Sequence, residues 1–423
     1  MGKHKKINQE NEKDNNSRLD SNQDEHPNNI IVGIVFIVGF SIIVFSIISV
    51  IFPGLLISAI GDGEFLEPFE MSVMGIPIIV TNIIIISLII LHNRHTLPNS
   101  IVVYIQKIFS FDLSQKSSLV LLIIVLGIYV ALSADEITIY ELNQYGDFLI
   151  VERAIEIWPD QESENEYVSE QLSRHVRMGL LVASEEIFNN VKILPFVASI
   201  LLLITTYFLA VRFSKKNFTG LIAVVLTLQS STFFTYDTIA VYENFWVLFY
   251  VFSIYLIFQK PKISSISYIL SIFSKAITVL MLPISILVTI FADISNKKKI
   301  FVIITHLIVL AVSLVIFQFS NTIYGNVINI NVSEFVTGFT TLGFNLRFDI
   351  VLLLFLLPVA IGLFLKAKNG SKNAISLMIL ICGTILVTPI LEMITDFYFV
   401  YPYRYVPLVV FFAISFSNIF SKK

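Results

Sequence analysis

Two carboxylates, Asp135 and Glu136, stand side by side directly after an apolar run from Ser118 to Leu132. The run predicts a helix that crosses a membrane, because lipid is the only solvent suited to so continuous an apolar segment. A charge at the edge of a bilayer is costly unless it faces water, a partner or a ligand. We therefore expect these acids to be candidates for proton transfer to or from a substrate held at the membrane surface.

Other charged residues are expected at a similar level on the same side. They are Asp237, Glu243, Lys275 and Arg404, with Arg174 and Arg177 in a polar loop. A carboxylate in such a set can deprotonate an acceptor hydroxyl, while Lys and Arg neutralise a leaving phosphate. These charged residues are thus typical of an enzyme that transfers a group from a donor in which the group is attached to a lipid phosphate. A simpler interpretation of the acids Asp135 and Glu136 is that they begin a solvated loop. A simpler interpretation of each cation is that its side chain snorkels to the membrane interface. For Arg177, anchoring to the membrane surface is the favoured interpretation.

Composition limits the class of protein. The chain has 423 residues, of which 56% are hydrophobic and 14% charged, more apolar surface than a soluble domain can bury. The net charge of −3 provides no basic stripe for a nucleic acid, so no nucleic-acid partner is expected. The single cysteine, Cys382, lies in an apolar run and excludes a disulfide framework.

Apolar segments separated by loops of alternating charge predict about twelve transmembrane helices in an all-α, multi-pass protein of the cell membrane. Loops rich in Lys and Arg are assigned to the cytoplasmic side. This places both termini in the cytoplasm, and residues 1–29 are too polar to fold alone and predict a disordered tail. The expected crossings are residues 30–51, 76–91, 118–133, 191–211, 218–234, 244–258, 263–274, 276–292, 300–318, 350–365, 374–390 and 405–419.

The largest predicted outer loop, residues 135–192, contains one segment with helical periodicity. In "NEYVSEQLSRHVRMGLLVASEEIF", the apolar residues Val168, Leu172, Val176 and Leu180 recur every four positions. Glu170 precedes Arg174 by four residues, the favourable order for an ion pair on a helix. The segment predicts an amphipathic helix that lies on the outer membrane surface.

Four motifs resemble the integral-membrane glycosyltransferases of the GT-C fold, which include protein O-mannosyltransferases and aminoarabinose transferases. "SADE" after the third apolar run is similar to their first outer loop, and "YDTIAVYENFWVLFYVFSIYLI" to their next acidic loop and helix. "SYILSIFSKAITVLMLPISIL" resembles their lysine-containing hairpin, and "PYRYVPLVVFFAI" the entry to a late helix. Two additional crossings precede the acidic helix, and the WWDYG-type signature of oligosaccharyltransferases is absent.

The resemblance implies a domain plan and a reaction. Residues 30–117 would form a two-helix N-terminal extension, and residues 118–423 the GT-C-like catalytic core. The reaction would be sugar transfer from a polyprenyl (dolichyl)-phosphate-linked donor to a protein, lipid or glycan acceptor on the outer face.

The resemblance also implies roles for the charged residues. Asp135 would be the catalytic base, and Glu136 would orient substrate or act as the base itself. Asp237 or Glu243 would bind sugar or help hold a divalent metal ion, although no histidine cluster predicts a metal. The phosphate would be held by two cations, Lys275 and Arg404, with assistance from Arg174 or Arg177.

Two other classes remain open at this point. A transporter or a flippase of lipid-linked glycans also crosses the membrane many times, but its charges are expected near the bilayer midplane. A membrane scaffold or sensor without chemistry would tolerate substitution of the same charges. The transferase interpretation requires Asp135, Asp237, Lys275 and Arg404 to line one cavity.

Overall fold

The computed structural model describes residues 29–55, 59–60, 64–65, 67–159, 163–319, 330–394 and 401–421. These residues form helices joined by short connections, apart from two antiparallel strands of two residues each, β1 (Ala59–Ile60) and β2 (Glu64–Phe65). The predicted all-α class is therefore confirmed. The predicted disordered tail lies outside the described residues, except for its last residue, Asn29.

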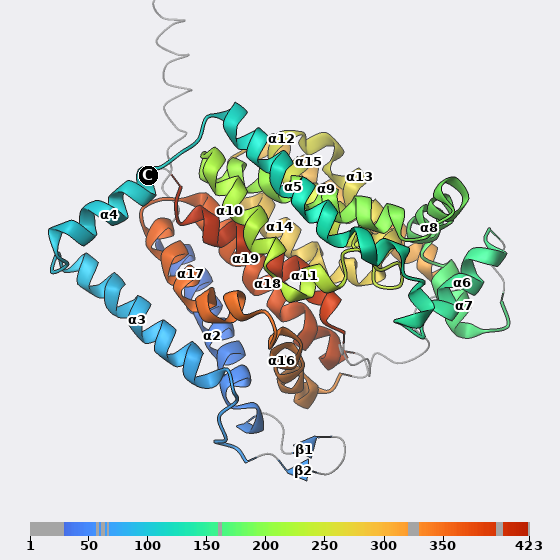
Figure 1. The fold of residues 1–423 in the computed structure, drawn as a ribbon, viewed down its shortest axis with the longest axis horizontal. Coiled ribbons are helices and arrows are strands. Elements are labelled where there is room, and N and C mark those ends of the chain that lie inside the picture. Colours follow the sequence, from blue (N-terminus) through green and yellow to red (C-terminus); the bar gives the residue numbers. More distant parts are fainter. Residues whose placement is uncertain are drawn as a thin grey trace, which may run out of the picture.

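Among the described residues, seven helices are long and apolar enough to cross a membrane, which indicates a multi-pass membrane protein (Figure 1). All seven coincide with predicted crossings. They are α2 (Asn29–Ile51), α3 (Gly75–Asn93), α5 (Gln115–Thr138), α9 (Ile193–Ser214), α15 (Asn296–Phe319), α17 (Ile350–Lys368) and α18 (Lys372–Ile394).

The other five predicted crossings coincide with shorter apolar helices of 10 to 15 residues, against the roughly 20 that a crossing usually needs. The number of twelve therefore stays a prediction. These helices are α10 (Asn217–Leu228), α12 (Phe245–Gln259), α13 (Pro261–Ser274), α14 (Leu282–Phe291) and α19 (Val406–Asn418).

The predicted surface helix is two helices, α7 (Glu166–Leu172) and α8 (His175–Phe188), with a break at residues 173–174. Val168 and Leu172 are buried, and the predicted ion pair between Glu170 and Arg174 is present. The remaining elements are short. They are η1 (Pro53–Leu55), α4 (Asn99–Ser110), η2 (Glu141–Asn143), α6 (Phe148–Ile157), α11 (Ser231–Thr235), η3 (Ala276–Met281), α16 (Val332–Leu346) and η4 (Pro402–Tyr405).

Polar side chains and prolines set several helix starts. Ser114 caps α5 by accepting a hydrogen bond from the backbone N–H of Ser117 at 3.1 Å, and Asn165 caps α7 in the same way through Tyr167 at 3.0 Å. Pro261 opens α13, where a missing N–H costs nothing. These local signals fix where the elements that carry the charged residues begin.

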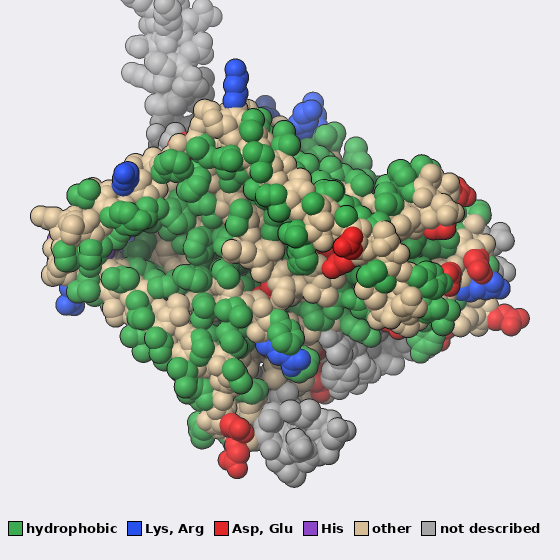
Figure 2. Space-filling view, in the orientation of Figure 1, with side chains coloured by type: hydrophobic (Ala, Val, Ile, Leu, Met, Phe, Trp, Pro, Cys, Tyr) green, Lys and Arg blue, Asp and Glu red, His purple; other side chains and the backbone are tan. Residues whose placement is uncertain are grey.

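The core of the molecule is built around α18 and α19, whose side chains are buried almost throughout. In contrast, only 17% of the apolar window of α3 or of α15 is buried. Figure 2 shows a broad hydrophobic surface with few charges across its middle, as expected for helices that face lipid. In the predicted N-terminal extension, α2 packs against α16, α17 and α18, so it joins the C-terminal part of the core.

Candidate functional site

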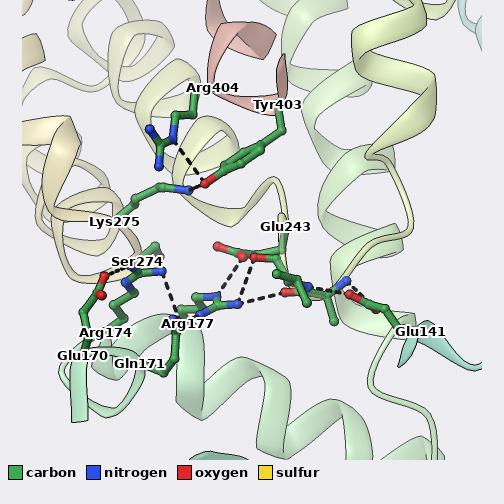
Figure 3. Close-up of polar contacts among 12 residues, drawn as sticks. Glu141, Glu170, Gln171, Arg174, Arg177, Glu243, Ser274, Lys275, Tyr403 and Arg404 are labelled. Carbon is green, nitrogen blue, oxygen red and sulfur yellow. Dashed lines mark hydrogen bonds and ion pairs between the residues drawn. The ribbon is translucent and has the colours of Figure 1, made fainter. Parts of the chain in front are cut away.

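The predicted site residues come from five separate segments that meet at the face of the molecule where α5 ends. Figure 3 shows Arg177 from α8, Glu243 from the loop before α12, Lys275 between α13 and η3, and Arg404 from η4 in one region. The folding of the short helices α11 to α13 brings these segments together. The expectation that charges far apart in the sequence gather at one place is therefore met for these four residues.

Arg177 and Glu243 form a buried ion pair. Arg177 Nε donates to Glu243 Oε2 at 2.8 Å, and each side chain is only 1% exposed. Arg177 also donates to Gln171 Oε1. The interpretation of Arg177 as a surface anchor is wrong, because the break between α7 and α8 turns its side chain inward. A buried guanidinium needs such a partner to offset its desolvation.

The loop that carries Glu243 is held from two sides. Arg177 Nη2 donates to the carbonyl oxygens of Ala240 and Val241 at 3.1 and 3.0 Å. Glu141, from η2, accepts the N–H groups of the same two residues at 2.8 and 2.7 Å. Burial raises the pKa of Glu141 above its usual range, although the two N–H groups oppose that shift. This clamp fixes the backbone between Asp237 and Glu243.

Lys275, Tyr403 and Arg404 form a second cluster, above the ion pair in Figure 3. Lys275 Nζ donates to Tyr403 Oη at 2.7 Å, and Arg404 Nε donates to the same oxygen at 3.3 Å. Burial lowers the pKa of Lys275 to about 8. Burial alone would raise the pKa of Tyr403, but the two adjacent cations outweigh it and lower the value to about 8.

The two clusters interact electrostatically. The pKa of Lys275 responds to the Glu243 carboxylate, which raises it, and to Arg174 and Arg404, which lower it. Arg174 shares the Gln171 side chain with Arg177 and pairs with Glu170. Among the described residues, this region gathers four cations, Arg174, Arg177, Lys275 and Arg404, with the three carboxylates of Glu141, Glu170 and Glu243. Such a region is suited to an anion with several oxygen atoms.

The carboxylates at the end of α5 do not share one location. Helix α5 extends to Thr138 instead of ending near residue 133, and neighbouring residues on a helix point about 100° apart. Glu136 is half-buried and its Oε2 accepts from Thr238 Oγ1 at 3.3 Å. Asp135 is exposed, and no side-chain hydrogen bond to another described residue is found for it. Glu136, and not Asp135, therefore lies with the site.

Asp237 is buried beside Glu136. Ser133 Oγ donates to its Oδ2 at 2.9 Å, whereas Oδ1 is buried without a hydrogen-bond partner among the described residues. Burial raises the pKa of Asp237 to about 6, and the nearby Glu136 carboxylate adds to that shift. Glu136 and Asp237 thus form an acidic pair, in which Asp237 takes up a proton at a higher pH than an exposed carboxyl group does.

Tyrosine rings connect the acidic pair to the cationic clusters. The ring of Tyr236, the residue before Asp237, lies 5.7 Å from the Tyr403 ring, and Tyr242 stacks on Tyr403 at 4.7 Å between centroids. Tyr242 also donates to Asp147 at 2.8 Å. Aromatic side chains therefore form one wall between the acids and the cations.

A cavity of about 410 Å³ lies on the other side of the α5 terminus. Its lining includes Glu141 and Lys192 but none of Asp135, Asp237, Lys275 and Arg404, so this cavity does not meet the expectation that those four residues line one cavity. Lys192 is 2% exposed, and its Nζ donates to the carbonyl oxygen of Glu136 at 3.0 Å. Lys192 therefore holds the turn that sets the position of Glu136.

Several residues of the site were missed by sequence reasoning. Glu141 is one of many acids in the loop of residues 135–192, and Lys192 stands alone at the start of an apolar run. Neither has a pattern that separates it from a solvated charge. Tyr403 had a usable signal, since it directly precedes Arg404 in the motif "PYRY".

In the part of the chain that the structure describes, no three or more His, Cys, Asp and Glu side chains are grouped to hold a metal ion. The resemblance allows a divalent metal ion at this site without predicting one. No family model, curated protein or solved structure matches this chain.

Proposed function

We propose that the protein is a membrane glycosyltransferase that moves a sugar from a polyprenyl-phosphate-linked donor to an acceptor on the outer face of the cell membrane. The supporting observation is the buried cationic region around Lys275 and Arg404, separated by Tyr236 from the acidic pair Glu136 and Asp237. Phosphate binding and acid–base chemistry require these two environments side by side.

The proposed topology follows from the same assignment. Twelve crossings with both termini in the cytoplasm place the ends of α5 and α13 outside, and the GT-C fold would provide this arrangement. The cationic region then lies at the depth of a lipid phosphate. Seven helices of adequate length support the multi-pass part of this topology.

The proposed reaction uses each group in a defined role. Lys275 and Arg404 bind the donor phosphate, with Tyr403 holding both cations in place. Glu136 accepts the proton of an acceptor hydroxyl, because it is the member of the acidic pair that reaches the surface. The acceptor oxygen bonds to the anomeric carbon of the sugar as the bond from that carbon to the phosphate oxygen breaks, and polyprenyl phosphate leaves.

Three other residues position these groups. Asp237 lies beside Glu136 and is itself held by the hydroxyl group of Ser133. Glu243 and Arg177 hold the loop that carries Asp237. Of the two bases that the resemblance allowed, Asp135 and Glu136, this assignment takes Glu136.

The test compares neighbouring acids in membranes supplied with radiolabelled polyprenyl-phosphate sugars. A general base contributes about 10²–10⁴-fold to a rate, so Glu136→Gln should reduce transfer by at least the lower value. Asp135 is exposed, and substitution at an exposed site usually changes stability by less than ~0.5 kcal/mol. Asp135→Asn should therefore retain sugar transfer within about threefold of the wild type. Equal transfer by wild type and Glu136→Gln would remove Glu136 from the reaction. Movement of the lipid-linked sugar across the membrane without transfer would support a flippase instead.

A further inference from the structure

The cavity of about 410 Å³ beside the end of α5 has no part in the proposed reaction. It lies where the chain that leaves α5 meets α6 and the connection between α8 and α9 (Figure 1). Its volume is in the range of about 300–1,000 Å³ that small-molecule sites have. Glu136 does not line it, and the Glu136 carboxylate contacts Thr238 instead. A ligand in this cavity would therefore be separate from a substrate at the proposed base.

The buried part of the lining holds two charges of opposite sign, Glu141 and Lys192, which are 1% and 2% exposed. Glu141 accepts the backbone N–H groups of Ala240 and Val241, and Lys192 donates to the carbonyl oxygen of Glu136. Each charge is thus held by the protein itself, and the two balance one another. The charge of the ligand is therefore decided by the more exposed part of the lining.

That exposed part is acidic. Its carboxylates are Glu152 and Glu156 from α6 and Glu185 from α8. Glu156 pairs with Arg153 at 2.7 Å, whereas Glu152 and Glu185 form no ion pair with any described residue. Glu152 accepts a hydrogen bond from Tyr140 Oη at 2.6 Å, which leaves its negative charge in place. After these pairs are matched, the described lining keeps two negative charges that attract a cation.

An aromatic wall adds a second signal for a cation. The rings of Tyr140 and Phe148 both line the cavity and are perpendicular, with centroids 5.7 Å apart and an interplanar angle of 89°. The face of an aromatic ring attracts a cation, and such rings are used to bind organic ammonium groups. Apolar contacts from Ile137, Ile155 and Val191 suit the carbon atoms of such a ligand. A bare metal ion, which needs oxygen ligands, would gain nothing from this wall.

We infer that this cavity binds the ammonium group of a small organic cation. The inference does not rest on the proposed function, because no residue of the lining is assigned to phosphate binding or proton transfer. The cavity belongs to the predicted outer loop of residues 135–192, so the ligand would enter from outside the cell. The same ammonium chemistry is found in free amines and in the headgroups of zwitterionic lipids.

The test is isothermal titration of the full-length protein in a nonionic detergent with two probes, choline and butylamine. At least one probe should bind saturably, while 3,3-dimethyl-1-butanol, which has the shape of choline without its charge, should not. Glu185→Gln should weaken binding about fivefold, as expected for a partly solvated ionic contact. Glu186→Gln is the matched control, because Glu186 is the next residue on α8 and also exposed but does not line the cavity.

The outcomes are read without measuring sugar transfer, so failure of the transferase proposal would leave them unchanged. A short-chain phosphatidylcholine that binds about tenfold more tightly than choline would support the inference and identify a lipid headgroup as the ligand. Choline that binds as tightly as this lipid would support a free cation. Absence of saturable binding by both probes would overturn the inference. Equal affinity of Glu185→Gln and Glu186→Gln, or of choline and its uncharged analogue, would overturn it too.

Discussion

At the scale of single residues, the site depends on Lys275, a lysine that is 8% exposed and whose ammonium group donates to the phenol of Tyr403. Lysine can lose its proton when desolvated, whereas arginine remains charged. Arg404 contacts the same phenol, so the two cations differ in how they respond to pH. The phosphate-binding role of Lys275 should therefore have a measurable pH limit.

We predict that affinity for an isoprenoid phosphate decreases as the pH rises through about 8. Burial lowers the pKa of Lys275 to about 8, so its ammonium is present below that pH and is lost above it. Losing one charge-assisted hydrogen bond should weaken binding about 10- to 100-fold. Binding is measured by isothermal titration between pH 7 and 9.5.

The double variant Lys275→Arg/Tyr403→Phe provides the matched control for this titration. Its guanidinium stays protonated throughout the range, and the phenol that would lose its proton near the same pH is absent, so the variant should bind with little dependence on pH. A wild-type protein whose affinity does not change between pH 7 and 9.5 would contradict the role of Lys275.

At the scale of secondary-structure elements, the loop between α11 and α12 is organised by contacts from outside itself. It is held by Glu141 from η2 and by Arg177 from α8, on opposite sides of Ala240 and Val241. Because the loop carries Asp237 and Glu243, the precision of the site depends on these two elements. Removing either contact should loosen the whole segment.

We predict that Arg177→Ala destabilises the protein by about 3–5 kcal/mol, because it leaves the buried Glu243 carboxylate without its ion-pair partner. The measurement is thermal unfolding in detergent. Arg153→Ala, which breaks an exposed pair with Glu156, should cost less than about 1 kcal/mol. The double variant Arg177→Ala/Glu243→Ala should be more stable than Arg177→Ala alone. Equal stability of Arg177→Ala and Arg153→Ala would rule out the clamp.

At the scale of the whole molecule, α2, the first helix of the described chain, packs against helices from the C-terminal part of the chain. It packs against α16, α17 and α18, while α3 packs against α17. The predicted extension and the C-terminal helices thus share one hydrophobic core. This arrangement requires the loops on each side of the bilayer to alternate as the basic residues predict.

Labelling of introduced cysteines tests this alternation, and Cys382→Ser first removes the single native thiol. Glu164→Cys should react with an impermeant maleimide in intact cells, because its loop is predicted outside. Lys262→Cys and Lys298→Cys should react only after permeabilisation, since both flank the hairpin of α13 and α14 on the inner side. Reaction of these two variants from opposite sides would show that the hairpin is a single crossing.

The sequence was sufficient for those features that depend on local composition. Continuous apolar runs predicted all seven long helices, because each run must avoid water wherever it lies in the fold. Spacing by four predicted the pair of Glu170 and Arg174, since a helix places such residues one turn apart. Charge placement also grouped Glu243, Lys275 and Arg404 in one region, whereas for Arg177 it favoured surface anchoring.

Tertiary structure alone decided which side of each element faces the site. One additional helical turn of α5 turns Asp135 to the surface and Glu136 toward Thr238, a difference that two adjacent acids in a sequence cannot reveal. Likewise, a break between two helices turns Arg177 inward to Glu243. Direction depends on where a helix ends and on what packs beside it, and both are set by contacts between residues that are far apart in the chain.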